Sequence, residues 1–124
     1  MRQVLLDTNF IVSCARKKID LFEDIPSMGL EIIIPRQVFD EIKKLSKSRE
    51  SANLREDADL ALKILNRSKF KTIKLEYNDV DKGIKRFANE NKDVIIATLD
   101  KEIQSEISNQ KLIIRGFKKL ELSA

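Results

Sequence analysis

Five short apolar runs, each separated from the next by helical periodicity, constrain the fold of this 124-residue chain more than any other feature. The runs cover residues 3–6, 30–35, 71–75, 93–98 and 111–116. Between them, apolar side chains recur every three or four residues over 8–17, 19–28, a segment after Pro35, 52–67, 79–90 and 100–108. Apolar strands that alternate with helices are typical of a parallel sheet covered on both faces. The sequence therefore predicts one domain over residues 1–124, a three-layer α/β/α sandwich with a central parallel five-stranded sheet, followed after Gly116 by a short tail.

Four acidic residues are predicted at the carboxyl edge of this sheet, where open α/β folds bind their ligands. Asp7 ends the first strand, and Asp100 lies just past the fourth. If those two strands are neighbours in the sheet, both carboxylates face the same crevice. Glu41 lies beside the buried stripe of the helix that follows the second strand. Asp81 lies in the first turn of the helix after the third strand, on its inward side. Four different strand–helix units thus each send one carboxylate toward the same edge.

Two neighbouring acids are predicted to lie elsewhere. Asp40 points away from the buried stripe of its helix, so Glu41 is the better candidate of this pair. Asp79 precedes the helix that carries Asp81 and is expected to cap it from outside.

Each of the four acids also has a purely structural interpretation. Asp7 and Asp100 could cap the helices that follow them. Asp81 could complement a helix dipole, and Glu41 could pair with Lys44 on a helix surface. Four unpaired carboxylates at one edge, however, would repel one another and raise one another's pKa, and a divalent cation would resolve that repulsion.

The amino-acid composition narrows the choice of cation. The chain has no histidine and one cysteine, Cys14, which lies in a predicted helix and is expected to be an inert core thiol. Histidine general bases, the usual Cys/His zinc sites and an internal disulfide are therefore excluded. Oxygen ligands alone select hard ions, Mg²⁺ or Mn²⁺.

Four segments together resemble the PIN-domain nuclease family: "LLDTNF", "IPRQVFDEIKKL", "DKGIKRFAN" and "VIIATLDKEI". The resemblance runs from Val4 to about Ile114 and is strongest to small archaeal PIN proteins, including VapC-type toxins. It implies that residues 1–124 form a single PIN-like nuclease domain whose acidic centre is Asp7, Glu41, Asp81 and Asp100, with Thr8 or Asn9 and Thr98 as polar helpers. One position departs from the family pattern, because Lys82 stands where many relatives carry a further acid.

The resemblance implies a Mg²⁺- or Mn²⁺-dependent endoribonuclease that hydrolyses RNA phosphodiester bonds. Asp7 would be the central metal ligand, with Asp81 and Asp100 completing the set. Glu41 would bind the metal through water or orient the nucleophile. Thr8, Asn9 and Thr98 would fix the rotamers of the carboxylates.

The RNA-binding surface is expected among the basic residues that follow Glu41, namely Lys43, Lys44, Lys47 and Arg49. An ordinary solvated face is an equally good interpretation of this run. The net charge of +4 permits a polyanionic partner without demonstrating one. The aromatic residues are six Phe and Tyr77, mostly on predicted core stripes, so no base-stacking platform is evident.

The partners and the competing functions follow from the same resemblance. A VapC-type toxin implies an antitoxin protein and a homodimer. A ribosomal-RNA processing nuclease and a catalytically silent RNA-binding module are alternatives within the family. A receiver-type signalling domain would need an Asp after the third strand and a Lys after the fifth, but the chain has Glu76 and "IIRG". No apolar run approaches the roughly 20 residues that span a bilayer, and the first residues do not form a signal peptide, so we expect a cytoplasmic protein with no membrane partner.

Overall fold

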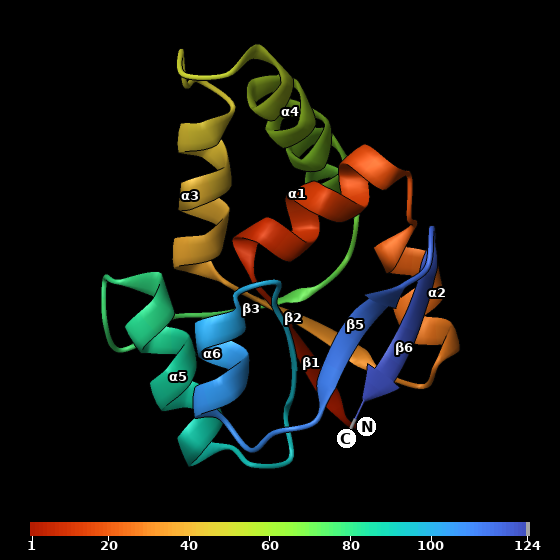
Figure 1. Ribbon diagram of the computed structural model, residues 1–124, viewed down its shortest axis with the longest axis vertical. Coiled ribbons are helices and arrows are strands. Elements are labelled where there is room, and N and C mark those ends of the chain that lie inside the picture. The colour runs from red at the N-terminus through yellow and green to blue at the C-terminus, as the bar shows by residue number, and fades with distance from the viewer. Residues whose placement is uncertain (124) are drawn as a thin grey trace.

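The computed structural model describes residues 1–123, which form a single sheet with helices on both faces (Figure 1). The strands are β1 (Gln3–Leu6), β2 (Glu31–Pro35), β3 (Lys71–Ile73), β4 (Ile95–Ala97), β5 (Lys111–Arg115) and β6 (Lys119–Ser123). The helices are α1 (Thr8–Lys17), α2 (Leu21–Ser27), α3 (Arg36–Leu45), α4 (Ala52–Asn66), α5 (Val80–Glu90) and α6 (Lys101–Glu106). The predicted α/β/α class and the predicted order of elements are confirmed.

The strands lie in the order β3-β2-β1-β4-β5-β6, and the first five in this row are parallel. Successive strands move outward from β1 to β3, and the chain then crosses back to β4 on the other side of β1. Right-handed connections therefore place α1 to α4 on one face and α5 and α6 on the opposite face. The strand order reverses between β1 and β4, so the ligand-binding crevice of this topology lies where those two strands end.

The prediction of five strands followed by a tail is wrong, because residues 119–123 form a sixth strand antiparallel to β5. Gly116 adopts φ 61°, a left-handed conformation that favours glycine, and the chain turns back there. In the returning strand Leu120 and Leu122 are half-buried against the core and pair with Ile114 and Leu112. Only two apolar residues alternate with polar ones in this segment, which is too weak a signal to distinguish a strand from a polar tail.

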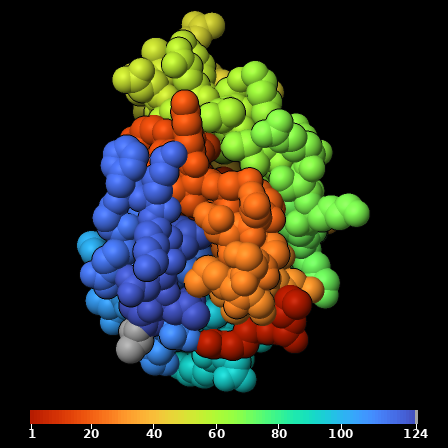
Figure 2. Space-filling view, turned by 90° about the vertical axis from the view of Figure 1, so that its right-hand side faces the viewer, coloured from red at the N-terminus to blue at the C-terminus, as the bar shows by residue number. Residues whose placement is uncertain are grey.

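The β5–β6 hairpin covers one end of the sheet and lies beside α2. Figure 2 shows the two side by side, the hairpin in blue and α2 in orange. Asp24 and Met28 on the α2 side face Phe117 and Lys118 of the hairpin turn across a shared groove. Within the hairpin, β6 pairs with the edge of β5 that would otherwise be open.

The hydrophobic core lies on both faces of β1, β2 and β4, whose central residues are almost fully buried. Phe10 and Cys14 of α1 pack into it with no exposed surface, and burial raises the pKa of the Cys14 thiol to about 12. Cys14 is thus the inert core thiol that its position predicted. Across residues 1–123, every helix is too short or too polar to traverse a lipid bilayer.

Candidate active site

Asp7 lies at the point where the strand order reverses. It follows β1 directly, and its backbone N–H donates to the carbonyl oxygen of Ala97, the last residue of β4, at 2.9 Å. The sequence placed Asp7 and Asp100 in one crevice only on the condition that their strands are neighbours, and β1 and β4 do pair. The crevice predicted from topology therefore exists.

All four predicted acids line one cleft of about 420 Å³ at this edge. We call it the acidic cleft and define it by its lining residues: Asp7, Thr8, Asn9, Glu41, Lys44, Leu45, Asp81 and Asp100. The side chains come from the ends of β1 and β4 and from the helices α1, α3 and α5. Residues up to 93 positions apart in the sequence thus meet at a single opening.

Asp7 is the buried member of the acidic cleft, with only 3% of its surface exposed. Its Oδ1 accepts a hydrogen bond from the N–H of Thr8 at 2.7 Å, and its Oδ2 accepts one from the hydroxyl of Thr98 at 2.6 Å. Burial raises the pKa of Asp7, the two hydrogen bonds oppose that rise, and the charges of Asp81 and Glu41 add to it. The Asp7 carboxylate is thus held in one orientation but forms no ion pair with any of residues 1–123.

Thr98 connects two of the acids. Its hydroxyl donates to Asp7 and also accepts the N–H of Asp100 at 3.1 Å. Its carbonyl oxygen accepts from the side-chain amide of Gln104 at 2.8 Å. Sequence reasoning found Thr98 but missed Gln104, which lies one helical turn after Asp100 and carries no signal beyond that spacing.

Glu41 is held by Thr8 rather than by a lysine. The Thr8 hydroxyl donates to Oε1 of Glu41 at 2.5 Å, so α1 and α3 are joined at the cleft. Among residues 1–123, no ion pair includes Glu41, Asp7, Asp81 or Asp100. The alternative in which Glu41 pairs with Lys44 is therefore wrong, although Lys44 does line the cleft.

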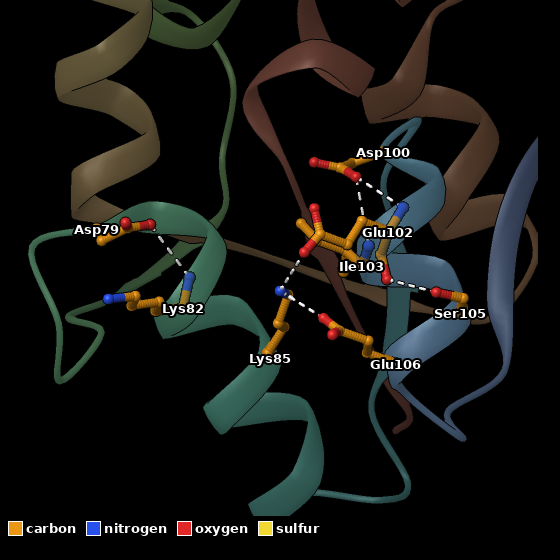
Figure 3. Close-up of polar contacts among 8 residues, drawn as sticks. All are labelled: Asp79, Lys82, Lys85, Asp100, Glu102, Ile103, Ser105 and Glu106. Atoms are coloured by element: carbon orange, nitrogen blue, oxygen red, sulfur yellow. Dashed lines mark hydrogen bonds and ion pairs between the residues drawn. The ribbon is translucent and has the colours of Figure 1, made fainter.

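Asp100 both caps the helix that follows it and lines the acidic cleft. Its Oδ1 accepts from the N–H groups of Glu102 at 2.9 Å and Ile103 at 3.3 Å, so it caps α6 (Figure 3). Its Oδ2 receives no hydrogen bond from the part of the chain that the structure describes. Asp7 likewise caps α1. Capping occupies one oxygen of Asp100 and leaves the other available to the cleft.

Asp81 stands in the first turn of α5, as predicted, and is exposed at the wall of the cleft. Partial desolvation raises its pKa, and the charges of Asp100, Asp79 and Glu41 raise it further. Lys85, one turn later on α5, bonds instead to Glu102 and Glu106 of α6 (Figure 3). Asp81 thus lies among like charges, and Lys85, whose charge lowers the pKa of Asp81, is itself bonded to α6.

Two residues near these acids also lie where the sequence placed them. Asp79 caps α5 through the N–H of Lys82 at 3.2 Å, and Asp40 is exposed and does not line the cleft.

Asn9 lines the cleft, but within residues 1–123 its side chain makes no hydrogen bond. Of the polar helpers, Thr8 and Thr98 are therefore the two that bond to carboxylates.

The basic run that follows Glu41 spreads over different sides of α3 and the turn after it. Lys44 lines the acidic cleft, whereas the ammonium group of Lys43 lies 4.7 Å from the ring centroid of Phe39, on the opposite side of the helix. Lys47 and Arg49 are exposed beyond the end of α3. One of the four basic residues thus reaches the cleft wall.

Two aromatic residues that lie outside the predicted core stripes have exposed rings. Phe117, at the turn of the β5–β6 hairpin, is 80% exposed, and Tyr77 is 41% exposed. Neither lines the acidic cleft. The cleft itself therefore offers no aromatic ring on which a base could stack.

The donor set of the acidic cleft suits a hard divalent cation. Carboxylate and hydroxyl oxygens are the ligands that Mg²⁺ and Mn²⁺ prefer, and the buried Asp7 carboxylate has no cationic partner within residues 1–123. No three acidic, histidine or cysteine side chains in that range already converge closely enough to hold an ion. The residues fit the cation by chemistry, and their side chains would have to draw together around it.

Known proteins are similar to this chain over most of its length. The sequence model of a family described as "PIN like domain" matches residues 4–117. A curated relative from Methanocaldococcus jannaschii, Ribonuclease VapC4, is 27% identical over 128 residues, which cover 98% of this chain and 97% of that protein.

Solved structures show the same fold. The PIN domain endonuclease Utp24 superposes with a TM-score of 0.74 at 26% identity, covering 96% of this chain and 90% of the other. A domain of a functionally unknown protein from M. jannaschii superposes with a TM-score of 0.56 at 14% identity, covering 96% and 95%. The latter supports the fold alone.

Proposed function

This chain belongs to the PIN-like domain family, and we propose that it is a Mg²⁺- or Mn²⁺-dependent endoribonuclease whose active site is the acidic cleft. The observation that carries the proposal is the convergence of four carboxylates, one of them almost completely buried, none of which forms an ion pair within residues 1–123. The names of two similar proteins, a ribonuclease and an endonuclease, support RNA hydrolysis within the strand. Family membership rules out the receiver-type alternative.

Asp7, Asp81 and Asp100 would hold the cation, with Asp7 at the centre. Mg²⁺ or Mn²⁺, when bound, supplies Lewis-acid chemistry that neutralises negative charge developing on a phosphodiester. Thr98 holds Asp7 and the backbone of Asp100 in fixed relation, so two of the three ligands are oriented before any ion arrives.

Glu41 and Lys44 would act on the substrate side of the cleft. Thr8 engages Oε1 of Glu41, which leaves Oε2 as the oxygen that can orient an attacking water or bind the ion through water. Lys44 would contact a phosphate at the cleft wall. Lys82 replaces a family acid in the first turn of α5, and the four remaining carboxylates suffice for the roles assigned here.

We further propose that the chain is the toxin of a toxin–antitoxin pair, with an antitoxin protein and a second copy of itself as partners. The support is the relative Ribonuclease VapC4, which is similar to this chain over nearly the whole of both proteins. A ribosomal-RNA processing nuclease is the alternative within the family. Four carboxylates brought to one cleft argue against the catalytically silent RNA-binding module.

Cleavage of end-labelled single-stranded RNA, with DNA of the same sequence in parallel, tests the proposed activity. We expect the parent protein to cut the RNA in Mg²⁺ or Mn²⁺ and to stop in EDTA, and the Asp7→Asn variant to be inactive. Asp40→Asn is the matched control, because it removes the same charge from an exposed acid outside the cleft. Cleavage that survives exhaustive chelation, or equal activity in Asp7→Asn and Asp40→Asn, would overturn the proposal.

A further inference from the structure

We propose that Gln37, Leu75 and Gly83 form a clamp that sets the position of Asp81 in the acidic cleft. The inference rests on the proposed function, because it assigns positioning residues to that site. Its starting point is a difference among the four acids. Asp7, Glu41 and Asp100 each accept at least one hydrogen bond, whereas the Asp81 carboxylate accepts none from residues 1–123. The location of Asp81 therefore depends on where α5 is seated.

Gln37 attaches the segment before α5 to α3. Its Oε1 accepts the N–H of Leu75 at 3.1 Å, and its Nε2 donates to the carbonyl oxygens of Leu75 at 2.8 Å and Tyr77 at 3.2 Å. One side-chain amide thus satisfies both backbone groups of Leu75, as a neighbouring strand would. Because β3 ends at Ile73, these bonds hold a stretch of chain that has already left the sheet.

Leu75 in turn seats α5. Gly83 is buried, and a Cβ atom added to it would lie 2.9 Å from both Cβ and Cδ1 of Leu75, closer than real contacts of this kind. The backbone of Gly83 does not have positive φ, so glycine is needed there for space rather than for conformation. Helix α5 can approach Leu75 this closely only because position 83 has no side chain.

The clamp connects two of the proposed metal-site acids. Gln37 lies four residues before Glu41 on α3, and Gly83 lies two residues after Asp81 on α5. A displacement of α5 away from Leu75 would therefore move Asp81 relative to Glu41 and to Asp7 and Thr98, which directly follow the central strands β1 and β4. We assign Gln37, Leu75 and Gly83 as positioning residues, since none of them lines the cleft.

Two variants test the clamp from its two sides. Gln37→Met keeps the length of the side chain and removes all three hydrogen bonds, and Gly83→Ala pushes α5 off Leu75. Gln3→Met is the matched control, because it removes the hydrogen bond from the Gln3 side chain to Glu31. Gln3 lies at the start of β1, at the opposite end of the strand from Asp7. Circular dichroism gives the folded fraction of each protein, and binding is referred to that fraction.

The readouts are Mn²⁺ affinity, measured by calorimetry on protein without RNA, and the separate kcat and KM for RNA cleavage. We expect Gln37→Met and Gly83→Ala each to weaken Mn²⁺ binding about tenfold or more, with a lower kcat and little change in KM. Gln3→Met should keep the parent Mn²⁺ affinity. Parent-like affinity in either folded clamp variant would overturn the clamp. Failure of the proposed function looks different, because then the parent itself would show no Mn²⁺ affinity beyond that of Asp7→Asn.

Discussion

At the scale of single residues, Asp7 is the group whose environment departs most from that of an ordinary surface carboxylate. Burial raises its pKa, and two hydrogen bonds offset part of that effect. An acid with a raised pKa in the folded state binds protons more tightly there than in the unfolded chain. The contribution of Asp7 to the free energy of unfolding therefore falls as the pH rises from the ordinary Asp value of 3.8 through the raised one.

Replacing Asp7 with Asn should remove this pH dependence while leaving the fold intact. The amide can accept the Thr8 N–H through its oxygen and donate to the Thr98 hydroxyl through its nitrogen, so both contacts survive. We expect the variant, in EDTA at neutral pH, to melt at the parent temperature or above it. As the pH rises through the acid range, the melting temperature of the variant should also fall less than that of the parent. The pH dependence that arises from the raised pKa of Asp81 should remain. A clearly lower melting temperature at neutral pH would mean that the buried charge stabilises the protein.

At the scale of secondary-structure elements, α6 begins at a residue that both caps the helix and lines the acidic cleft. Asp100 caps the helix through Oδ1, lines the cleft, and has in Oδ2 an oxygen that accepts no hydrogen bond from residues 1–123. Asn caps helices about as well as Asp, whereas Ala costs about 1 kcal/mol of stability. We predict that Asp100→Asn and Asp100→Ala both abolish RNA cleavage and that only Asp100→Ala lowers the free energy of unfolding measured with urea in EDTA. An Asn variant that cuts RNA at the parent rate would reduce Asp100 to a cap.

Helix α3 separates the basic residues that were expected to bind RNA together. Lys44 lies on the side of the helix that lines the cleft, and Lys43 lies against Phe39 on the other side. For single-stranded RNA we predict that Lys44→Ala reduces the slope of log affinity against log salt by about 0.7, the value for one phosphate contact. Lys43→Ala should reduce the slope less than Lys44→Ala does. The triple variant of Lys43, Lys44 and Lys47 should reduce the slope more than Lys44→Ala only if Lys47 also contacts a phosphate. Equal slopes in the parent and the triple variant would make this run a solvated face.

At the scale of the whole molecule, the acidic cleft exists only in the folded state. Its acids come from residues 7, 41, 81 and 100, which an unfolded chain does not bring together. A cation that binds the assembled cleft must therefore stabilise the fold, by about 2.7 kcal/mol at a concentration one hundred times its Kd. We predict that Mn²⁺ or Mg²⁺ raises the melting temperature of the parent in a scanning calorimeter and that EDTA reverses the rise. The shift should disappear in Asp7→Asn, and a shift of equal size there would place the binding elsewhere.

The amino-acid sequence alone determined every element except β6, and it determined the edge of the sheet at which the four acids lie. The alternation of apolar strands with amphipathic helices reflects burial, which acts on local patterns and can be recognised without coordinates. The same holds for the capping positions Asp79 and Asp100, because a helix needs acceptors at its first N–H groups wherever it lies. Asp7 and Asp100 could be assigned to one edge because the ends of parallel strands share it.

Only the tertiary structure decided which of these groups meet. Strand order, the antiparallel pairing of β6 and the bond from Thr8 to Glu41 depend on how elements pack, and packing distances are not written in any local pattern. The proposed clamp at Gln37 could not be predicted for the same reason. The hydrogen-bond partners of Gln37 are known only once the fold places Leu75 against α3. Local periodicity indicates which side of an element is buried, whereas the element that packs against that side depends on contacts throughout the whole chain.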